Sequence, residues 1–511
     1  MFARLNSIGL YGMDAFGVTV ETDIANGLPG FDVVGLPGAA VKESRDRVRS
    51  ALKNCGFTFP VNRITVNLAP ADKRKEGPIY DLPMLLSILA ASGQLSCDLS
   101  DCAVIGELSL SGETHGVRGV LPMAIHAKQL GYRRLFVPAA NAPEGAVVNG
   151  LEVYPVSNMK QLIDHLTGTQ VITPQRPLTA PETSSMLALP DFADVRGQSD
   201  AKHALEIAAS GGHNILLLGP PGSGKSMLAK RLPSILPPMT FDETIETTKL
   251  HSIAGIMPPG ASLVQRRPFR APHHTVSAAG LSGGGSIPKP GEISLAHNGV
   301  LFLDELPEFT KSAMEVLRQP LEDGTVTISR ANGNYTYPCS VMFVAAMNPC
   351  PCGYFGHSGH ACTCTPSMVS KYLSRVSGPL LDRLDLHIEV PAVAFEELST
   401  KKAAESSAEI KKRVDAARAI QNERFAGTGV TCNAKMTPAL LQQHCQLDQT
   451  ARQLLKNAFE KFGLSARAYD RVLKVARTIA DLDGGGQIQS AHIAQAVQYR
   501  SLDRKYWNKE L

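Results

Sequence analysis

The chain has 511 residues, of which 43% are hydrophobic and 19% charged, and its formal net charge is +4. This length corresponds to about three domains, since one domain takes roughly 150 residues. The composition is typical of a globular protein and excludes a chain that is disordered throughout. A net charge this small does not by itself indicate nucleic-acid binding.

The N-terminus carries no pattern typical of export. It contains an early Arg4 but no continuous apolar stretch before Asp14, so no signal peptide is expected. The longest apolar run, 82–91, is too short to cross a bilayer and is typical of a buried helix. We therefore expect a cytoplasmic protein without a membrane partner, whose ten cysteines are reduced unless some bind metal.

Four regions follow one another along the chain. Residues 1–166 alternate strand-like and helix-like stretches, which predicts an α/β domain. Residues 167–190 are rich in Pro, Thr and Ser without a helical or strand period, which is typical of a linker. Residues 191–395 alternate again and predict a second α/β domain. Residues 396–511 are helical in pattern and predict a C-terminal lid domain.

Charge is concentrated in the helical region. Residues 401–511 have a net charge of +8, which leaves −4 for the rest of the chain. The excess indicates either a solvated helical surface or a surface that faces a polyanion. The sequence leaves both interpretations open.

Three short strands of the second domain are strongly apolar, at 214–218, 300–303 and 341–346. Continuous apolar runs of this length are typical of strands buried on both faces of a parallel sheet. We therefore predict that the central domain is built on such a sheet.

A phosphate-binding loop follows the first of these strands and precedes a helix-like stretch. It matches the pattern G-x-x-x-x-G-K-[ST] through Gly219, Pro220, Pro221, Gly222, Ser223, Gly224, Lys225 and Ser226. Backbone N–H groups of such a loop surround the phosphates, Lys225 reaches the terminal phosphates, and Ser226 binds Mg²⁺. The strand and helix on either side disfavour an incidental glycine-rich turn. ATP and Mg²⁺ are therefore the expected cofactors.

The other two apolar strands end in polar residues. Asp304 and Glu305 follow the second strand, where a carboxylate is needed for Mg²⁺ and another to polarise the attacking water. Asn348 follows the third strand, at the sheet edge where ligands bind, and is expected to orient the water.

Four cysteines lie in the loop 350–364. Cys350, Cys352, Cys362 and Cys364 are arranged as two C-x-C pairs around His357 and His360. Four thiolates in one short loop favour a structural Zn²⁺ site over four unligated thiols. Whether a histidine replaces one thiol stays open.

These motifs resemble those of the AAA+ superfamily, in the branch that contains magnesium chelatase and the MCM helicases. Three longer blocks, 267–285, 291–309 and 372–390, resemble the ComM/YifB group of magnesium-chelatase-related ATPases. The resemblance covers essentially the whole chain. It implies a central AAA+ domain within a homohexameric ring, with ATP sites between subunits.

The resemblance also implies roles for three arginines. Arg383 lies in a segment similar to the arginine-finger segment, and Arg375 is the second candidate. Arg467 resembles the sensor 2 arginine of the helical lid. The alternative for each is an ordinary surface ion pair.

In related motors, an insertion after the P-loop helix and a hairpin face the channel of the ring. The corresponding residues here are Lys289 and, in the hairpin 323–338, Arg330 and Tyr335. They are expected either to contact DNA or to be ordinary loop residues.

Residues 75–83 and 106–113 resemble the Lon-protease domain, which has a ribosomal S5 domain 2-like fold. That family needs a serine where this chain has Ile79, and a lysine in the region that here reads 119–123 without one. We expect the fold to be kept and the peptidase activity to be lost, which leaves a scaffold or a DNA-contacting role.

By this resemblance the leading hypothesis is an ATP-dependent helicase or translocase that promotes branch migration in homologous recombination during natural transformation. Its expected partners are single-stranded or branched DNA, further copies of the chain, and recombination proteins. A protein-remodelling ATPase and a magnesium-chelatase-type subunit are the alternatives.

Overall fold

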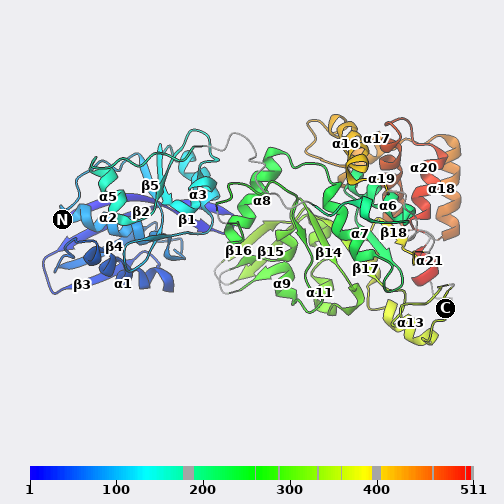
Figure 1. Cartoon of the computed structure of the whole chain (residues 1–511), viewed down its shortest axis with the longest axis horizontal. Helices are drawn as coiled ribbons and strands as arrows, with labels where there is room; N and C mark the ends of the chain where they lie inside the picture. The colour runs from blue at the N-terminus through cyan, green and yellow to red at the C-terminus, as the bar shows by residue number, and fades with distance from the viewer. Residues whose placement is uncertain are drawn as a thin grey trace. The chain divides into compact units, whose positions relative to one another are not determined.

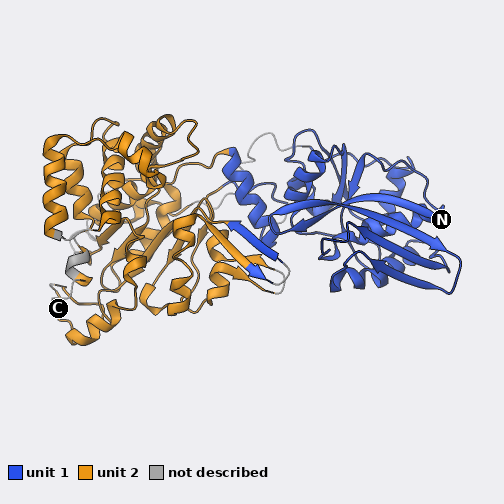
Figure 2. Ribbon diagram, turned by 180° about the vertical axis from the view of Figure 1, so that it is seen from behind, with its two compact units in different colours: residues 1–184, 241–265, 329–337 blue, residues 185–240, 266–328, 338–511 orange. Residues whose placement is uncertain are grey.

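The computed structural model describes residues 1–176, 189–258, 260–285, 288–330, 333–357, 359–393, 404–462, 465–500 and 502–507. Its contacts divide the chain into two compact units, coloured separately in Figure 2. The first comprises 1–184, 241–265 and 329–337, and the second comprises 185–240, 266–328 and 338–511. Most of the predicted linker, 177–188, lies outside the described residues.

The first unit is built on a four-stranded sheet with the order β1-β2-β4-β3. The strands are β1 (Phe2–Tyr11), β2 (Asp14–Ala25), β3 (Gly30–Val34) and β4 (Arg63–Ala69). Buried residues alternate along β2, which is typical of a strand with one covered face. Helices α1 (Ala39–Asn54) and α2 (Asp81–Ala91) pack against each other, and α2 is the buried helix predicted from the apolar run.

A smaller parallel sheet, β5-β8-β9, completes this unit. Its strands are β5 (Cys102–Val104), β8 (Arg134–Pro138) and β9 (Glu152–Val156). The hairpin β6 (Glu107–Leu108) and β7 (Thr114–His115) and the helices α3 (Val120–Gln129), α4 (Ala142–Gly145) and α5 (Met159–Leu166) lie between and after them. The first domain is thus α/β, as predicted.

Two segments from the predicted second domain, 191–395, belong to the first unit. Helix α8 (Phe241–Ala254) contacts α3, where Gly119 N donates to the carbonyl of Ser252 at 3.3 Å. The side chain of Ser252 contacts buried Glu144. Tyr335, on β16 (Gly333–Pro338), lies with its ring 4.8 Å from the ring of Tyr11. The hairpin residue expected at a channel thus packs on an aromatic side chain of this unit.

The second unit contains a five-stranded parallel sheet with the order β11-β14-β17-β10-β18. Its strands are β10 (Ile215–Leu218), β11 (Phe269–Arg270), β14 (Val300–Leu303), β17 (Met342–Met347) and β18 (Leu386–Glu389). Strands β14, β17 and β18 of this sheet are labelled in Figure 1. Every residue of β10, β14 and β17 is buried. The three predicted strands are therefore confirmed, and they lie side by side at the centre of the sheet.

Short elements connect these strands. They include α6 (Ser199–Gly211), α7 (Lys225–Arg231), α9 (Ala278–Ser282), β12 (Gly283–Gly284), β13 (Lys289–Pro290), α10 (Glu292–Leu295), α11 (Lys311–Glu315), α12 (Pro320–Asp323), β15 (Thr325–Arg330), α13 (Pro366–Leu373) and α14 (Gly378–Leu381). Lys289 is exposed on β13, and Arg330 is exposed at the end of β15.

The C-terminal part is helical, as predicted. It contains α16 (Ser407–Arg424), α17 (Pro438–His444), α18 (Gln449–Phe462), α19 (Ala466–Leu482), α20 (Ser490–Gln498) and α21 (Leu502–Trp507). A capping box of Ser406 and Glu409 starts α16. The final helical stretch is divided into α20 and α21.

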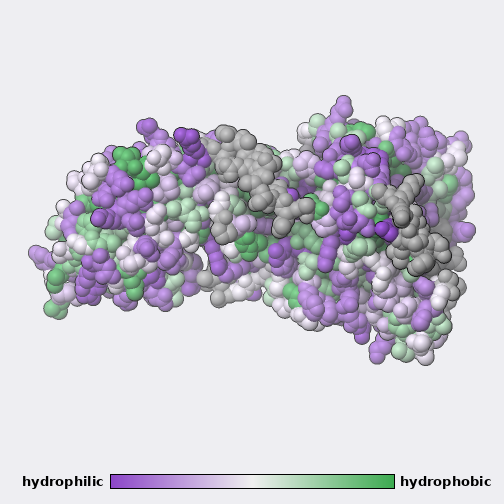
Figure 3. All heavy atoms as spheres, in the orientation of Figure 1, coloured by the Kyte–Doolittle hydropathy of each residue, from purple (hydrophilic) through white to green (hydrophobic). Residues whose placement is uncertain are grey.

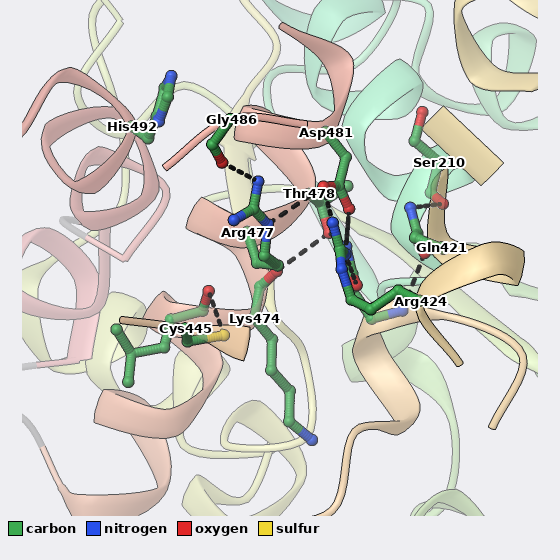
Figure 4. Close-up of polar contacts among 12 residues, drawn as sticks. Ser210, Gln421, Arg424, Cys445, Lys474, Arg477, Thr478, Asp481, Gly486 and His492 are labelled. Carbon is green, nitrogen blue, oxygen red and sulfur yellow. Dashed lines mark hydrogen bonds and ion pairs between the residues drawn. The ribbon is translucent and has the colours of Figure 1, made fainter. Parts of the chain in front are cut away.

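A buried polar network joins these helices (Figure 4). Asp481 of α19 is fully buried and accepts hydrogen bonds from Arg424, Arg477 and Asn433. Gln421 of α16 donates to the carbonyl of Ser210 in α6 at 3.1 Å. Because buried charges need partners, these contacts fix the helices to each other and to the sheet's flanking helix.

A second buried contact fixes the lid to the sheet. Asp385, next to β18, accepts hydrogen bonds from Arg471 of α19 at 2.9 Å and from Asn214 N at 3.0 Å, and it lies 3.4 Å from Nδ1 of His213. Burial would raise the pKa of Asp385, but His213, Arg471 and the N–H group hold it well below its ordinary value. Helix α19, which carries Arg467, is thereby anchored to the ATPase sheet.

Hydrophilic residues dominate the face drawn in Figure 3, and hydrophobic residues occur there in small groups. Among the described residues, no helix combines the length and the apolar character needed to cross a bilayer.

Candidate active site

The P-loop connects the end of β10 to the start of α7. Gly222 and Gly224 adopt positive φ angles of 76° and 89°, which a glycine reaches without strain. Helix α7 begins at Lys225. The local fold of the loop is therefore the one predicted from the motif.

Lys225 lies under this loop and is only 8% exposed. Its Nζ donates to two backbone carbonyls of the loop, each at 2.8 Å, and to Oδ1 of Asn348 at 3.1 Å. Burial lowers the pKa of Lys225 to about 8, although Asp304 and Glu305 act in the opposite direction. A buried ammonium whose hydrogen-bond partners are neutral suits a ligand that brings negative charge, such as a triphosphate.

Ser226 and Asp304 form the oxygen-rich part of the site. The hydroxyl of Ser226 contacts Oδ2 of Asp304, and Oδ1 of Asp304 accepts the N–H of Glu305 at 2.9 Å. Hydroxyl and carboxylate oxygens are the ligands that Mg²⁺ prefers in nucleotide sites. The predicted Mg²⁺ ligands thus lie together and fit this ion.

Glu305 has a partner that the sequence interpretation missed. Its Oε2 lies 3.3 Å from Nδ1 of His274, and its backbone is left-handed with φ of 52°. The His274 ring lies 4.0 Å from the ring of His273. His274 follows β11, so its only sequence signal is a histidine pair after a short strand.

Neighbouring segments hold the P-loop on two sides. A Cβ atom on Gly219 would lie 2.1 Å from the carbonyl oxygen of Val390, so only glycine fits there. Gln198 donates to the carbonyls of Ser223 at 3.2 Å and of Pro391 at 2.6 Å. Its role was also missed, because residues so distant in sequence give no local signal.

Arg383 and Arg467 lie at a common acidic residue. Arg383 donates to the carbonyl of Arg318 at 2.7 Å and contacts Glu322, and its side chain is 12% exposed. Arg467 is 65% exposed, with Nη2 3.7 Å from Glu322. The structure thus brings the two arginines together at Glu322.

Arg375 takes a different position. It donates to the carbonyl of Pro307 at 3.3 Å and to the carboxylate of Glu308 at 3.1 Å. Glu308 is three residues beyond Glu305. Arg375 therefore lies beside the segment of its own chain that carries Glu305.

The four cysteines of the loop 350–364 form one cluster, with all four Sγ atoms within 4.8 Å of one another. The Sγ atom of Cys352 lies 3.3 Å from that of Cys350 and 3.5 Å from that of Cys362. Four Zn–S bonds of about 2.3 Å in a tetrahedron separate sulfurs by about 3.8 Å. The thiols are thus spaced closely enough to bind one zinc ion.

Backbone N–H groups surround these sulfurs. Gly353 N and Phe355 N donate to Sγ of Cys350 at 3.2 Å and 3.3 Å. Burial would raise the pKa of Cys352, but N–H groups of Tyr354 and Thr363 and the neighbouring thiols lower it to about 5. Such donors stabilise thiolates, the form that binds metal.

The Lon-like site of the first unit carries no nucleophile at its expected position. Ile79 is 6% exposed on a short turn of helix, Pro78–Tyr80. The adjacent buried Asp81 binds Arg47 at 2.6 Å and contacts Ser44. The hydroxyl of Ser44 is therefore part of a structural network with the Asp81–Arg47 ion pair.

Family comparisons match three parts of the chain. Residues 191–398 match the family described as "Magnesium chelatase, subunit ChlI". Residues 20–141 match "Subunit ChlI of Mg-chelatase", and residues 404–500 match "Magnesium chelatase, subunit ChlI C-terminal". The three matches span both units.

Individual relatives match over nearly the full length. The chain is 46% identical to "Competence protein ComM" of Haemophilus influenzae and 44% identical to "Uncharacterized protein YifB" of Salmonella typhimurium, in each case over 96% of both chains. It is 30% identical to "Lon protease 2" of Bacillus subtilis over 27% of this chain and 26% of that one. With its Lon-like domain, AAA+ domain and helical lid, the chain belongs to the ComM/YifB family of magnesium-chelatase-related AAA+ ATPases.

Proposed function

We propose that the chain is an ATP-driven DNA motor that promotes branch migration during recombination of DNA acquired by natural transformation. The contact of Lys225 with Asn348, beside the Ser226 and Asp304 pair, carries the motor part of this proposal. The identity of 46% to a competence protein over 96% of both chains carries the DNA part.

In this mechanism the P-loop and Lys225 bind the triphosphate. Ser226 and Asp304 hold Mg²⁺, which would neutralise charge on the phosphates. Glu305 accepts a proton from the attacking water, and Asn348 orients that water. Since Glu305 lies beside His274, this pair must open before Glu305 reaches the water.

The test is movement of a labelled branched DNA junction by purified protein with ATP and Mg²⁺. The Glu305→Gln variant, which keeps the shape of the side chain, is the control and should bind ATP without moving the junction. Failure of the wild-type protein to move junctions would overturn the DNA proposal.

The partial match to a Lon protease favours a protein-remodelling ATPase as the second candidate. Buried Ile79 in place of a nucleophile argues against proteolysis itself. ATPase activity stimulated by an unfolded protein but not by DNA would favour this candidate.

We further propose that the ATPase assembles as a homohexamer, that Arg383 acts on the ATP of a neighbouring subunit, and that Arg467 reaches ATP from the helical lid. Both arginines lie at Glu322, and Arg383 lies in the segment that resembles the arginine-finger segment of this branch. A guanidinium supplied by a neighbour would stabilise charge on the transferred phosphoryl group. Mass determination of the ATP-bound protein tests the assembly, and a monomer at all concentrations would exclude it.

We propose that Cys350, Cys352, Cys362 and Cys364 bind one structural zinc ion. Their mutual distances and the N–H donors to Cys350 support this assignment. Elemental analysis of protein purified without chelators should give one zinc per chain. Protein without zinc would refute the assignment.

A further inference from the structure

The cysteine cluster begins immediately beyond the ATP site. Strand β17 ends at Met347, Asn348 accepts the hydrogen bond of Lys225, and Cys350 follows two residues later. Cys350 is fully buried, whereas the other three cysteines are partly exposed. Only one residue therefore separates Cys350 from Asn348.

The loop that carries the four cysteines also touches the P-loop directly. Gly353 is buried, and a Cβ atom on it would lie 2.4 Å from Cδ and 3.1 Å from Cγ of Pro221. Its backbone is therefore in contact with the Pro221 ring, at a distance that only glycine permits. Its φ of 88° also favours glycine.

Gly353 links this contact to a cysteine. Its N–H donates to Sγ of Cys350 at 3.2 Å while its α-carbon faces Pro221. The position of Gly353 thus depends on how firmly the Cys350 sulfur is held. A metal that joins Cys350 to Cys362 and Cys364 would close this loop and restrict its conformations.

We propose that the cysteine cluster regulates ATP binding: with zinc bound, it holds Gly353 against Pro221 and fixes Asn348 beside Lys225. Loss of the metal releases both contacts, and release of the contact with Pro221 in the P-loop lowers the affinity for ATP. This inference rests on the zinc site proposed above and assigns it a regulatory role at the nucleotide site.

The first experiment measures zinc content and the affinity for a fluorescent ATP analogue on the same wild-type protein. A zinc-selective chelator should remove the metal and weaken nucleotide binding about tenfold, and added zinc should restore it. Zinc removal that leaves the affinity unchanged would overturn the regulatory role while leaving the zinc site intact. Absence of zinc from untreated protein would instead overturn the site itself.

The second experiment separates the contact from the metal. The Gly353→Ala variant keeps all four thiols but places a methyl group against Pro221, so it should retain one zinc per chain and bind the analogue about tenfold more weakly. Gly429→Ala is the matched control, because Gly429 also has a positive φ, of 73°, and a Cβ atom there meets nothing within 4 Å. Wild-type affinity in zinc-loaded Gly353→Ala would overturn the proposal, and the retained zinc reports that the loop has folded.

Discussion

The ammonium of Lys225 donates to the side-chain carbonyl of Asn348 at 3.1 Å, although the two residues are 123 positions apart. This bond joins the P-loop to the end of β17, the central strand beside β10. Because the acceptor is a neutral amide, the positive charge of Lys225 remains available to a phosphate.

This relationship predicts different effects for two substitutions of Asn348. Asn348→Asp keeps the shape but adds a carboxylate beside Lys225, which would compete with the phosphates and weaken ATP binding about tenfold. Asn348→Ala should bind ATP nearly as well as the wild type but hydrolyse it about 100-fold more slowly. Binding of a fluorescent ATP analogue and phosphate release measure the two quantities. Equal affinities of both variants would contradict this account of the lysine.

The contact between His274 and Glu305 predicts a restraint on hydrolysis in the absence of DNA. Removing the imidazole in His274→Ala frees the carboxylate to accept a proton from water, so basal ATP turnover should rise about threefold and stimulation by DNA should fall. His273→Ala is the matched control, since Nδ1 of His273 faces Thr275 at 3.0 Å instead. Unchanged basal turnover in His274→Ala would argue against a restraining role.

The sequence predicted those parts of the site that local patterns encode. The P-loop glycines, the buried strands and the acidic pair after β14 depend on neighbouring residues and on a fixed period, and the structure has the predicted strands in place. The contacts of His274 and Gln198 join segments far apart in the sequence, so no spacing rule could indicate them.

Two other features also depended on tertiary packing. The hairpin pattern around Tyr335 left open a DNA contact and an ordinary hairpin residue, and it gave no indication that this ring packs on Tyr11. The pattern of 396–511 indicated helix without giving the breaks between helices, whereas the structure ends this region with two helices, α20 and α21. Periodicity indicates which face of a helix or strand is apolar, but not which other part of the protein that face contacts.

Glu144 offers a test of the contact between α8 and the rest of the first unit. Burial raises the pKa of Glu144 despite hydrogen bonds from Ser252 and from Leu121 N. An acid whose pKa is higher in the folded state than in the unfolded state contributes stability at pH values below its unfolded-state pKa. This contribution is lost as the pH rises through its folded-state pKa. The ionised carboxylate therefore destabilises the fold at neutral pH.

The isosteric Glu144→Gln variant keeps the acceptor oxygen without the charge. It should raise the apparent melting temperature of the first unit by about 2 °C at pH 7.5, and this advantage should disappear as the pH is lowered towards 4.5. Scanning calorimetry at the two pH values measures the difference. An advantage that grows as the pH falls would show that the sign assigned to Glu144 is wrong.

The position of Arg383 and Arg467 at Glu322 predicts complementation between two inactive variants. Lys225→Ala cannot bind ATP but still offers Arg383 to a neighbour, whereas Arg383→Ala binds ATP but offers no such guanidinium. If the arginine acts across a subunit interface, an active site needs an intact Lys225 from one subunit and an intact Arg383 from its neighbour. In an equal mixture each requirement is met by half of the subunits, so about a quarter of the sites should regain activity.

Phosphate release by the mixture, compared with each variant alone, measures this recovery. The bonds of Arg383 to Arg318 and Glu322 also support the local fold. The nucleotide affinity of Arg383→Ala must therefore match that of the wild type, which shows that the fold is intact. The matched mixture of Lys225→Ala with Glu305→Gln should stay inactive, since both substitutions lie in the same half of the site. Activity in that control, or none in the first mixture, would place Arg383 outside the shared site.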